Sequence, residues 1–362
     1  MASPALTVSA PGKLILSGEH AVVYGRPALV AAIDLRLSAH LSPSAQTGVR
    51  LDLPGLNHSE HLSWQQVRDY SRAARDRWGE YALHPDPESF REMRGEDPAH
   101  VVKAALGEAV GLLGGEPDRG LDLRIDSALP IGSGFGSSAA TAVAVIAGYL
   151  SFTGTDVDPA TIERLALEVE RRQHGMPSGV DGATILRGGV LSACKTSSGG
   201  LEIVPVRVRS PLLSRIRVYD TGMPPEATGA VVAAVRRRRE EDPARIEAVL
   251  DRFEAATAAF RSELEREEED RDRALHLIRE AQVCLEDLGV VPEPVRLAVR
   301  QIEAVGGAAK VSGAGSLEGP GAGSLLVYHP DPETLLGCAV LRSFPYYAVH
   351  LGAPGFRQEA AG

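Results

Sequence analysis

Apolar and polar residues alternate in several short stretches of this chain, whereas other stretches are apolar over longer distances. Leu6–Ala10 and Leu121–Ile125 alternate in this way, a pattern typical of strands with one buried face. Residues 139–150 are apolar almost all round, which indicates a helix enclosed by the rest of the fold. The chain is therefore predicted to contain both strands and helices.

Proline and glycine mark where these elements begin and end. The segment Leu6–Leu37 is predicted to form a strand, a turn at Pro11-Gly12 and a second strand. Residues 99–113 have apolar positions near helical spacing, and an Asp-Pro pair opens an amphipathic helix over residues 158–173. A further strand is expected over residues 186–193.

The chain is long enough for two domains. Its 362 residues compare with roughly 150 residues for a typical domain. Paired glycines at positions 199 and 200 interrupt the pattern near the middle. We expect one domain at residues 1–200 and a second at residues 201–362.

The most distinctive stretch is PIGSGFGSSAA, residues 130–140, between a predicted strand and a predicted helix. Gly132, Gly134 and Gly136 leave a run of backbone N–H groups unshielded by side chains, and two serines follow as the helix begins. Such a loop suits a phosphate group. It is not a Walker A loop, which ends in Gly-Lys-Ser/Thr, and it lacks the spacing of a dinucleotide fingerprint. A glycine-rich turn before a core helix is the alternative.

Composition and charge narrow the class of ligand. The formal net charge is -10, which argues against nucleic acid or an anionic membrane surface, because these partners attract dense positive charge. Cys194, Cys284 and Cys338 have no CxxC spacing, so neither a disulfide framework nor a structural zinc site is indicated. This cysteine usage fits a reducing, cytoplasmic compartment. Neither a basic leader nor an apolar run of ~18 residues is found.

Three polar residues stand close together in apolar sequence near the start of the chain: Lys13, Glu19 and His20. Buried charge is costly unless it is partnered, so such residues gather where a polar ligand binds. Each also has a structural interpretation. These are a strand-end lysine with a buried stem, a turn carboxylate and a satisfied core histidine.

Two acidic residues flank a turn after the second predicted helix. Glu170 lies near the helix end, and Asp181 follows eleven residues later, beyond a turn rich in glycine and proline. This spacing can bring both carboxylates to one cavity, one to hold a metal and the other to meet a hydroxyl. As isolated residues, Glu170 would equally pair with Arg171 or Arg172 on the surface, and Asp181 would be a turn carboxylate.

Three motifs together resemble the GHMP small-molecule kinase superfamily, which includes galactokinase, homoserine kinase, mevalonate kinase and phosphomevalonate kinase. They are SAPGK at residues 9–13 running into GEHAVVYG at 18–25, the loop PIGSGFGSSAA, and HGMPSGVD at 174–181. Within the superfamily the chain resembles the mevalonate kinase family, whose Gly-Glu-His-Ala-Val-Val sequence is close to residues 18–23. Galactokinases carry a sugar-recognition variant at the corresponding place.

The resemblance implies a fold and a reaction. The fold is α+β with two domains, an N-terminal nucleotide domain like ribosomal protein S5 domain 2 and a C-terminal ferredoxin-like α+β domain. The site lies in the cleft between them. The reaction is ATP-dependent phosphorylation of the primary hydroxyl of mevalonate to give 5-phosphomevalonate, a step of isoprenoid precursor synthesis. A homodimer is also implied.

Residues of this chain fall on the family's catalytic and metal positions. The resemblance implies that Asp181 is the catalytic base, which accepts the proton of the attacking hydroxyl. Lys13 would lower the pKa of that hydroxyl, orient Asp181 and stabilise charge on the transferring group. Ser138 and Glu170 fall on the ligands of Mg²⁺, an ion that prefers oxygen ligands.

The resemblance also implies substrate and nucleotide contacts. Glu19 and His20 would position mevalonate together with Lys13 and Asp181, and Thr228 is a candidate for a further contact, with an N-cap role as the alternative. The implied nucleotide contacts are Asn57, Ser127, Gly132, Ser133, Gly134, Phe135, Gly136, Ser137 and Ser138. Turn chemistry explains Asn57 equally well, and a hydroxyl bonded to backbone explains Ser127.

One stretch departs from the family pattern. Residues 310–315 begin like its C-terminal glycine loop, but Ser316–Pro320 intervenes before the next glycines and the strand Leu325–Tyr328. We expect this insertion to bulge to solvent or to act as a mobile flap. Glu318 is expected to point away from bound phosphates, because two negative charges repel.

Two other functions stay open at this point. One is a related kinase acting on phosphomevalonate or another small alcohol, although Arg26 is the one extra cation near Glu19 and His20 in the sequence. The other is a nucleotide-binding sensor without catalysis, which the altered loop permits. Retention of Lys13, Glu170 and Asp181 argues against the sensor.

Overall fold

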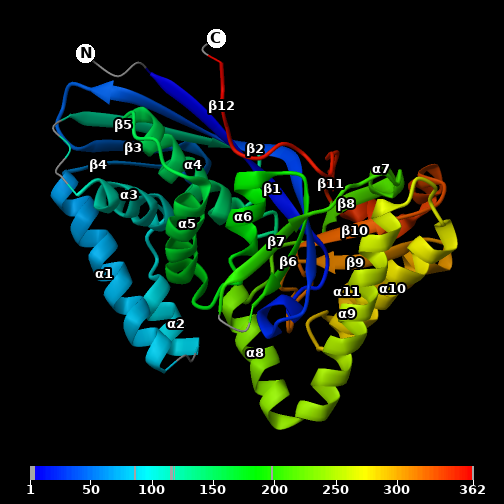
Figure 1. Cartoon of the computed structure of the whole chain (residues 1–362). Coiled ribbons are helices and arrows are strands. Elements are labelled where there is room, and N and C mark those ends of the chain that lie inside the picture. Colours follow the sequence, from blue (N-terminus) through cyan, green and yellow to red (C-terminus); the bar gives the residue numbers. More distant parts are fainter. Residues whose placement is uncertain (1–4, 85–86, 115–116, 118, 197–198, 361–362) are drawn as a thin grey trace.

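Two β-sheets organise the chain, and each carries its own layer of helices (Figure 1). The structure is a computed structural model that describes residues 5–84, 87–114, 117, 119–196 and 199–360. In this part of the chain, eight strands form the first sheet and four form the second. The expected mixture of helices and strands is confirmed.

The first sheet has the strand order β12-β1-β2-β5-β3-β4, and β6 and β7 extend it from β2. Its strands are β1 (Leu6–Ser17), β2 (Ala28–Ser44), β3 (Val49–Leu53), β4 (His58–Leu62), β5 (Gly120–Ser127), β6 (Val190–Lys195), β7 (Leu201–Pro205) and β12 (Arg357–Gln358). The turn predicted at Pro11-Gly12 is wrong. β1 continues through this dipeptide, where its register with β2 shifts, because a β-bulge absorbs the irregularity without ending the strand.

Among the described residues, six α-helices lie between β4 and β6 in the sequence. They are α1 (Trp64–Leu83), α2 (Pro87–Arg94), α3 (His100–Leu113), α4 (Ser137–Phe152), α5 (Pro159–His174) and α6 (Val180–Arg187). The predicted helices at 99–113, 139–150 and 158–173 are α3, α4 and α5. α4 is buried along most of its length and packs on β1 and β2, as its apolar sequence requires.

The second sheet has the order β11-β8-β10-β9 and is antiparallel at each pairing. Its strands are β8 (Ile216–Asp220), β9 (Ala308–Ser312), β10 (Ser324–Tyr328) and β11 (Tyr346–Tyr347), and its helices are α7 (Leu212–Arg215), α8 (Thr228–Glu241), α9 (Pro243–Glu265), α10 (Arg271–Asp287) and α11 (Glu293–Ala304).

In the first sheet, the strand expected over residues 186–193 is displaced. Residues 186 and 187 end α6, and β6 begins at Val190.

The two halves are joined by more than one crossing of the chain. β7 and β12 lie beyond residue 200 but belong to the first sheet, and β12 pairs with β1 (Figure 1). Ser17 Oγ lies 2.7 Å from Thr257 Oγ1 of α9. Among the described residues, no helix combines the length and apolar character needed to cross a bilayer.

Candidate active site

A cavity of about 490 Å³ lies where the two halves meet. Residues of β1, of the glycine loop before α4 and of the α5–α6 turn line one part of it, and the start of α8 and the loop after β9 line another. The three sequence motifs therefore converge on one concave site, although they are far apart in the chain. Convergent polar groups in a large cavity are the usual mark of a ligand site.

The glycine loop is shaped by the close approach of backbone at Gly134 and of a side chain at Gly136. Gly134 has φ +82°, and a Cβ there would lie 3.0 Å from Ser312 O. Gly136 has φ +78°, and a Cβ there would lie 2.8 Å from Lys13 Cγ. L-amino acids rarely adopt this conformation. Gly136 is also the N-cap of α4 and provides no side-chain cap, so the first N–H groups of the helix remain available to a ligand.

Ser133 faces away from the cavity. Its hydroxyl donates a hydrogen bond to Asp220 Oδ2 at 2.6 Å, and its carbonyl oxygen accepts one from Ser324 N at 2.9 Å. The loop is therefore held by the second half through Ser133. Gly132, Gly134, Phe135, Gly136, Ser137 and Ser138 line the cavity. A contact from Ser133 to a nucleotide would have to use its backbone.

Lys13 and Asp181 meet inside the cavity. Lys13 Nζ lies 3.0 Å from Asp181 Oδ2, and the side chains are 5% and 30% exposed. The backbone N–H of Lys13 donates to Phe135 O at 2.9 Å, which fixes β1 against the glycine loop. Asp181 lies in the first turn of α6, which begins after Gly179, where the helix dipole stabilises its negative charge.

Glu170 lies beside this pair in a buried position. Its Oε1 accepts a hydrogen bond from Gly182 N at 3.0 Å. Burial, together with the negative charge of Asp181, raises the pKa of Glu170 to about 8, although the Gly182 N–H and Lys13 oppose the rise. A cation bound here would favour loss of the proton from the Glu170 carboxyl, because positive charge stabilises the ionised carboxylate.

Ser138 makes a contact that the motifs did not reveal. Its Oγ lies 2.9 Å from His174 Nε2. Desolvation lowers the pKa of His174 to about 4, so the ring is neutral at neutral pH. The sequence analysis gave His174 no role beyond its place in a motif, because nothing in the sequence shows that α4 and the end of α5 are neighbours.

Glu19 and His20 line the cavity from the segment between β1 and β2. Glu19 forms an ion pair with Lys310, a residue to which the sequence analysis assigned no role. His20 has φ +59°, and its Nε2 donates to Ala314 O at 2.9 Å. Burial lowers the pKa of His20, so its ring is neutral and Nδ1 is an acceptor.

The remaining predicted contacts fall in different places. Ser127 lines the cavity, and its hydroxyl also accepts a hydrogen bond from Leu129 N at 3.1 Å. Asn57 is exposed, has φ +49° and ends the short helix Pro54–Leu56. It is not among the residues that line the cavity, whereas its neighbour Leu56 is.

Thr228 lines the cavity at the first position of α8. The alternative, an N-cap role for Thr228, is wrong, because the N-cap is Ala227 and it provides no side-chain cap. Since alanine has no hydrogen-bonding side chain, the first N–H groups of α8 are left for another partner.

The insertion at Ser316–Pro320 is fastened at its base. Ser316 Oγ lies 2.7 Å from Glu226 Oε2, and Glu318 N donates to Glu226 Oε1 at 3.0 Å. Residues 318–320 are exposed, and Glu318 is not among the residues that line the cavity. Ser316 is buried, so only the second part of the insertion, residues 318–320, reaches solvent.

A second group of side chains, of the kinds that bind metal ions, contacts a lysine. His58, Glu60 and Asp97 have ligand atoms close together. Lys103 Nζ lies 2.8 Å from Glu60 Oε1 and 2.7 Å from Asp97 Oδ2. The lysine ammonium already neutralises these carboxylates, so this group needs no ion.

Comparison with known proteins agrees with the geometry. Residues 99–189, which include the glycine loop and both acidic residues, match the family model described as the GHMP kinases N terminal domain. The mevalonate kinase of Thermococcus sibiricus is 31% identical over 347 residues, which cover 92% of this chain and 91% of the relative. The chain belongs to the mevalonate kinase family. Members of this kinase family use ATP as phosphoryl donor.

Solved structures show that the whole chain has the GHMP kinase fold. The L. major mevalonate kinase in complex with R-mevalonate matches with a TM-score of 0.69 at 20% identity, covering 98% of this chain and 100% of that one. The Lactococcus lactis galactokinase complexed with galactose matches with a TM-score of 0.72 at 17% identity, covering 98% and 95%. The fold is therefore shared with kinases that act on other acceptors. The side chains in the cavity, rather than the fold, must determine which acceptor is bound.

Proposed function

We propose that this chain transfers the γ-phosphoryl group of ATP to the primary hydroxyl of mevalonate and so makes 5-phosphomevalonate. One observation carries the proposal. Lys13 and Asp181 form an ion pair inside a cavity that the glycine loop also lines. Phosphoryl transfer requires little covalent chemistry from the protein, and positioning and charge neutralisation supply most of the catalysis. The family membership supports mevalonate as the acceptor.

Asp181 acts as the general base in this proposal. It accepts the proton of the attacking hydroxyl as the oxygen approaches the γ-phosphorus. Its 30% exposure leaves room for that hydroxyl. Lys13 holds Asp181 by its ion pair and places a positive charge beside the transferring group, where it stabilises the charge that develops on the oxygens.

The glycine loop and the start of α4 bind the β- and γ-phosphates in this proposal. The loop and the first residues of α4 line the cavity, and no side chain caps the helix start, where the positive end of the helix dipole lies. Ser127 and the backbone of the loop provide further nucleotide contacts. Asn57 stays a weaker candidate, since Leu56 rather than Asn57 lines the cavity.

Ser138 and Glu170 would hold Mg²⁺. Both line the cavity, and one hydroxyl and one carboxylate are the hard oxygen donors that this ion prefers alongside phosphate oxygens and water. The raised pKa of Glu170 also fits, because a buried carboxylate beside Asp181 lacks a cation of its own. The bound ion supplies positive charge that neutralises the phosphates. His174 orients the Ser138 hydroxyl through their hydrogen bond.

Glu19, His20 and Thr228 would receive mevalonate. Glu19 Oε2 and His20 Nδ1 are buried and have no partner among the described residues, and both are acceptors that suit a hydroxyl group. The carboxylate of mevalonate needs donors instead. The uncapped start of α8 at Thr228 offers N–H groups and a hydroxyl for it.

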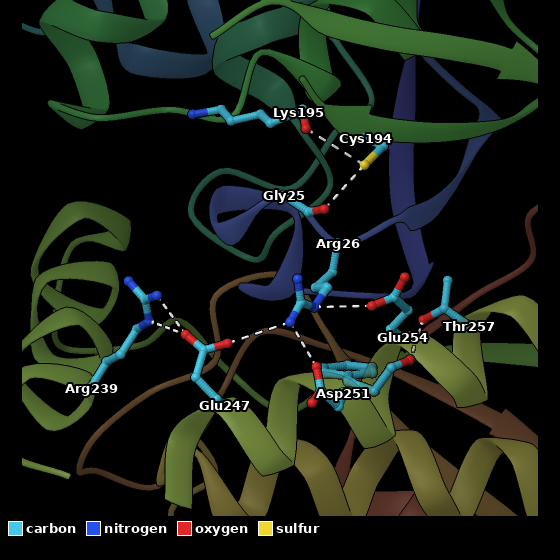
Figure 2. A network of polar contacts seen from close by, with 10 residues as sticks. Gly25, Arg26, Cys194, Lys195, Arg239, Glu247, Asp251, Glu254 and Thr257 are labelled. Atoms are coloured by element: carbon cyan, nitrogen blue, oxygen red, sulfur yellow. Dashed lines mark hydrogen bonds and ion pairs between the residues drawn. The ribbon is translucent and has the colours of Figure 1, made fainter. Parts of the chain in front are cut away.

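The extra cation that would favour a phosphorylated acceptor is already paired. Arg26, the extra cation near Glu19 in the sequence, forms ion pairs with Glu247, Asp251 and Glu254 of α9 at 3.4, 2.6 and 2.9 Å (Figure 2). Because three carboxylates already neutralise this guanidinium, it is not free to bind a second phosphate. Arg26 therefore gives no support for phosphomevalonate, whereas the family membership supports mevalonate.

An ADP-release assay tests the proposal directly. The purified chain is supplied with ATP, Mg²⁺ and, in turn, mevalonate, phosphomevalonate, galactose and homoserine. We expect mevalonate to give the highest kcat/KM. A higher value for another acceptor would replace mevalonate with that acceptor, and ATP binding without turnover of any acceptor would support the nucleotide-sensor alternative.

The proposal also includes the domain division, the oligomeric state and the cellular location. Residues 1–200 would form the nucleotide domain and residues 201–362 the second domain, with β7 and β12 returning to the first sheet. A homodimer is expected from the family, and light scattering measures it. A cytoplasmic location is supported by Cys194, Cys284 and Cys338, all of which are free thiols, as a reducing compartment requires.

A further inference from the structure

A lysine of the second half reaches into the first half beside the proposed acceptor pocket. Lys310 lies in the middle of β9, and its side chain is 1% exposed. Its Nζ forms an ion pair with Glu19 Oε1 and donates a hydrogen bond to Ile15 O at 3.2 Å. Ser312 Oγ accepts another from Ile15 N at 2.8 Å. β9 is therefore fixed against the end of β1, just before Glu19.

This ion pair occupies only one oxygen of the carboxylate. Glu19 Oε2 is buried without a protein partner among the described residues, and the same is true of His20 Nδ1 beside it. Both residues line the cavity, whereas Lys310 is not among the lining residues. A buried polar atom without a partner is costly unless a ligand or water satisfies it. Oε2 is thus available to a bound molecule.

We propose that Lys310 is a positioning residue for the acceptor: it holds Oε1 of Glu19 and thereby presents Oε2 to a hydroxyl of the acceptor. The inference rests on the proposed function, in which Glu19 contacts mevalonate. Lys310 does not touch the acceptor in this arrangement and acts through Glu19. The second half would in this way set the geometry of acceptor binding in the first.

Charge explains why a lysine stands at this position. Burial raises the pKa of Glu19, and the charges of Lys310 and, more weakly, Lys13 oppose that rise. An ionised carboxylate only accepts hydrogen bonds, so its free oxygen selects an O–H or N–H group of the ligand. Without the ammonium, the same carboxyl would take up a proton more readily and lose part of this selectivity.

The segment that carries Glu19 has a second tether, which provides a matched control. Arg26, at the other end of this segment, pairs with carboxylates of α9, and Gly25 O accepts a hydrogen bond from Cys194 Sγ at 3.3 Å (Figure 2). This tether holds the segment without touching Glu19. A variant of Arg26 therefore loosens the segment but leaves the charge next to Glu19 unchanged.

The test compares Lys310→Met with Arg26→Gln. Methionine keeps most of the length of lysine and removes its charge. For Lys310→Met we expect the KM for mevalonate to rise about tenfold or more and the KM for ATP to change less than about twofold. We also expect the acid limb of kcat/KM for mevalonate to move to higher pH, because Glu19 loses the cation that opposes protonation. Arg26→Gln should change neither quantity.

A double variant tests whether Lys310 acts through Glu19. In the Glu19→Gln background, Lys310→Met should raise the KM for mevalonate by less than about twofold, because the carboxylate that it positions is already absent. The double variant buries no unpaired charge, so it remains informative if Lys310→Met alone fails to fold. Thermal melting of each variant monitors folding.

The outcomes separate this inference from the proposed function. A tenfold effect of Lys310→Met that persists in the Glu19→Gln background would overturn the inference, as would equal increases in the KM values for mevalonate and ATP. Either result would leave mevalonate kinase activity of the wild-type chain intact. A wild-type chain that does not phosphorylate mevalonate would overturn the proposed function and the inference with it.

Discussion

Lys13 Nζ and Asp181 Oδ2 lie 3.0 Å apart, although β1 and α6 are separated by most of the first half of the chain. The pair is held from both sides. The Lys13 N–H is bonded to Phe135 O of the glycine loop, and Gly182, next to Asp181, is bonded to Glu170. The proposed base Asp181, Lys13, the glycine loop and the proposed metal ligand Glu170 are therefore linked by direct contacts.

Replacing Asp181 tests its role as base. Asp181→Ala should lower kcat by about 10³-fold and leave nucleotide affinity nearly unchanged, because the glycine loop remains intact. Turnover is measured by ADP release and nucleotide affinity by calorimetry. Asp69→Ala, on an exposed part of α1, is the control and should keep full activity. Normal turnover by the Asp181 variant would remove this residue from the mechanism.

Replacing Ser138 tests the proposed metal site. Ser138→Ala should raise the Mg²⁺ concentration needed for half-maximal activity by about tenfold, a loss typical of one ligand or its supporting partner. Activity is titrated against Mg²⁺ at fixed ATP. Ser151→Ala, near the other end of α4, is the matched control. An unchanged Mg²⁺ requirement in the Ser138 variant would mean that this hydroxyl does not bind the ion.

The stability of the fold should fall in mild acid. Burial lowers the pKa of His100 to about 4, well below its ordinary value, so the unfolded chain binds a proton more readily than the folded chain. Stability is therefore complete above about pH 6.5 and is lost as pH falls toward 4, by up to about 3 kcal/mol for this residue. Urea unfolding at a series of pH values measures the loss.

A matched variant isolates this contribution. His100→Gln retains polar groups near Tyr70 and Arg172, which the ring contacts, but it does not titrate. The variant should therefore lose less stability than the wild-type chain between pH 6.5 and pH 4.5. An identical pH dependence in both proteins would assign the acid sensitivity to other groups.

A buried ion pair joins the helices behind the site. Arg172 is 1% exposed, and its guanidinium lies 2.6 Å from Glu108 Oε1. Arg172→Met should destabilise the fold by about 1.5–3 kcal/mol, because Glu108 loses its buried partner and keeps Arg75, which lies 2.6 Å from the same oxygen. Chemical denaturation measures this. The double variant Arg172→Met with Glu108→Gln should recover part of the loss, and no recovery would show that packing rather than charge dominates.

The sequence predicts the elements that depend on local pattern. Residues 139–150 are apolar on every side, and α4 is buried as that pattern requires. Asp158 precedes a proline, and its side chain accepts a hydrogen bond from Thr161 N at 3.0 Å as the N-cap of α5. Such signals lie within a few residues, so a single sequence contains them.

The sequence does not predict contacts between distant strands. The Pro11-Gly12 dipeptide has the composition of a turn, but pairing with β2 keeps it inside a strand. Lys310 lies in an apolar strand, and only the packing of β9 against β1 shows that its partner is Glu19. Ser133 belongs to a phosphate-loop motif, yet Asp220 of the second half turns its hydroxyl away from the cavity.

The pairing of β12 with β1 affects how the protein is synthesised. Ser9 in β1 donates a hydrogen bond to Glu359, 350 residues further along the chain, and Glu359 N donates to Thr7 O at 2.9 Å. A nascent chain on the ribosome therefore exposes one edge of its first strand until residues 357–359 emerge. Translation that stops before this point yields a chain with an open strand edge, which other chains can pair with and aggregate.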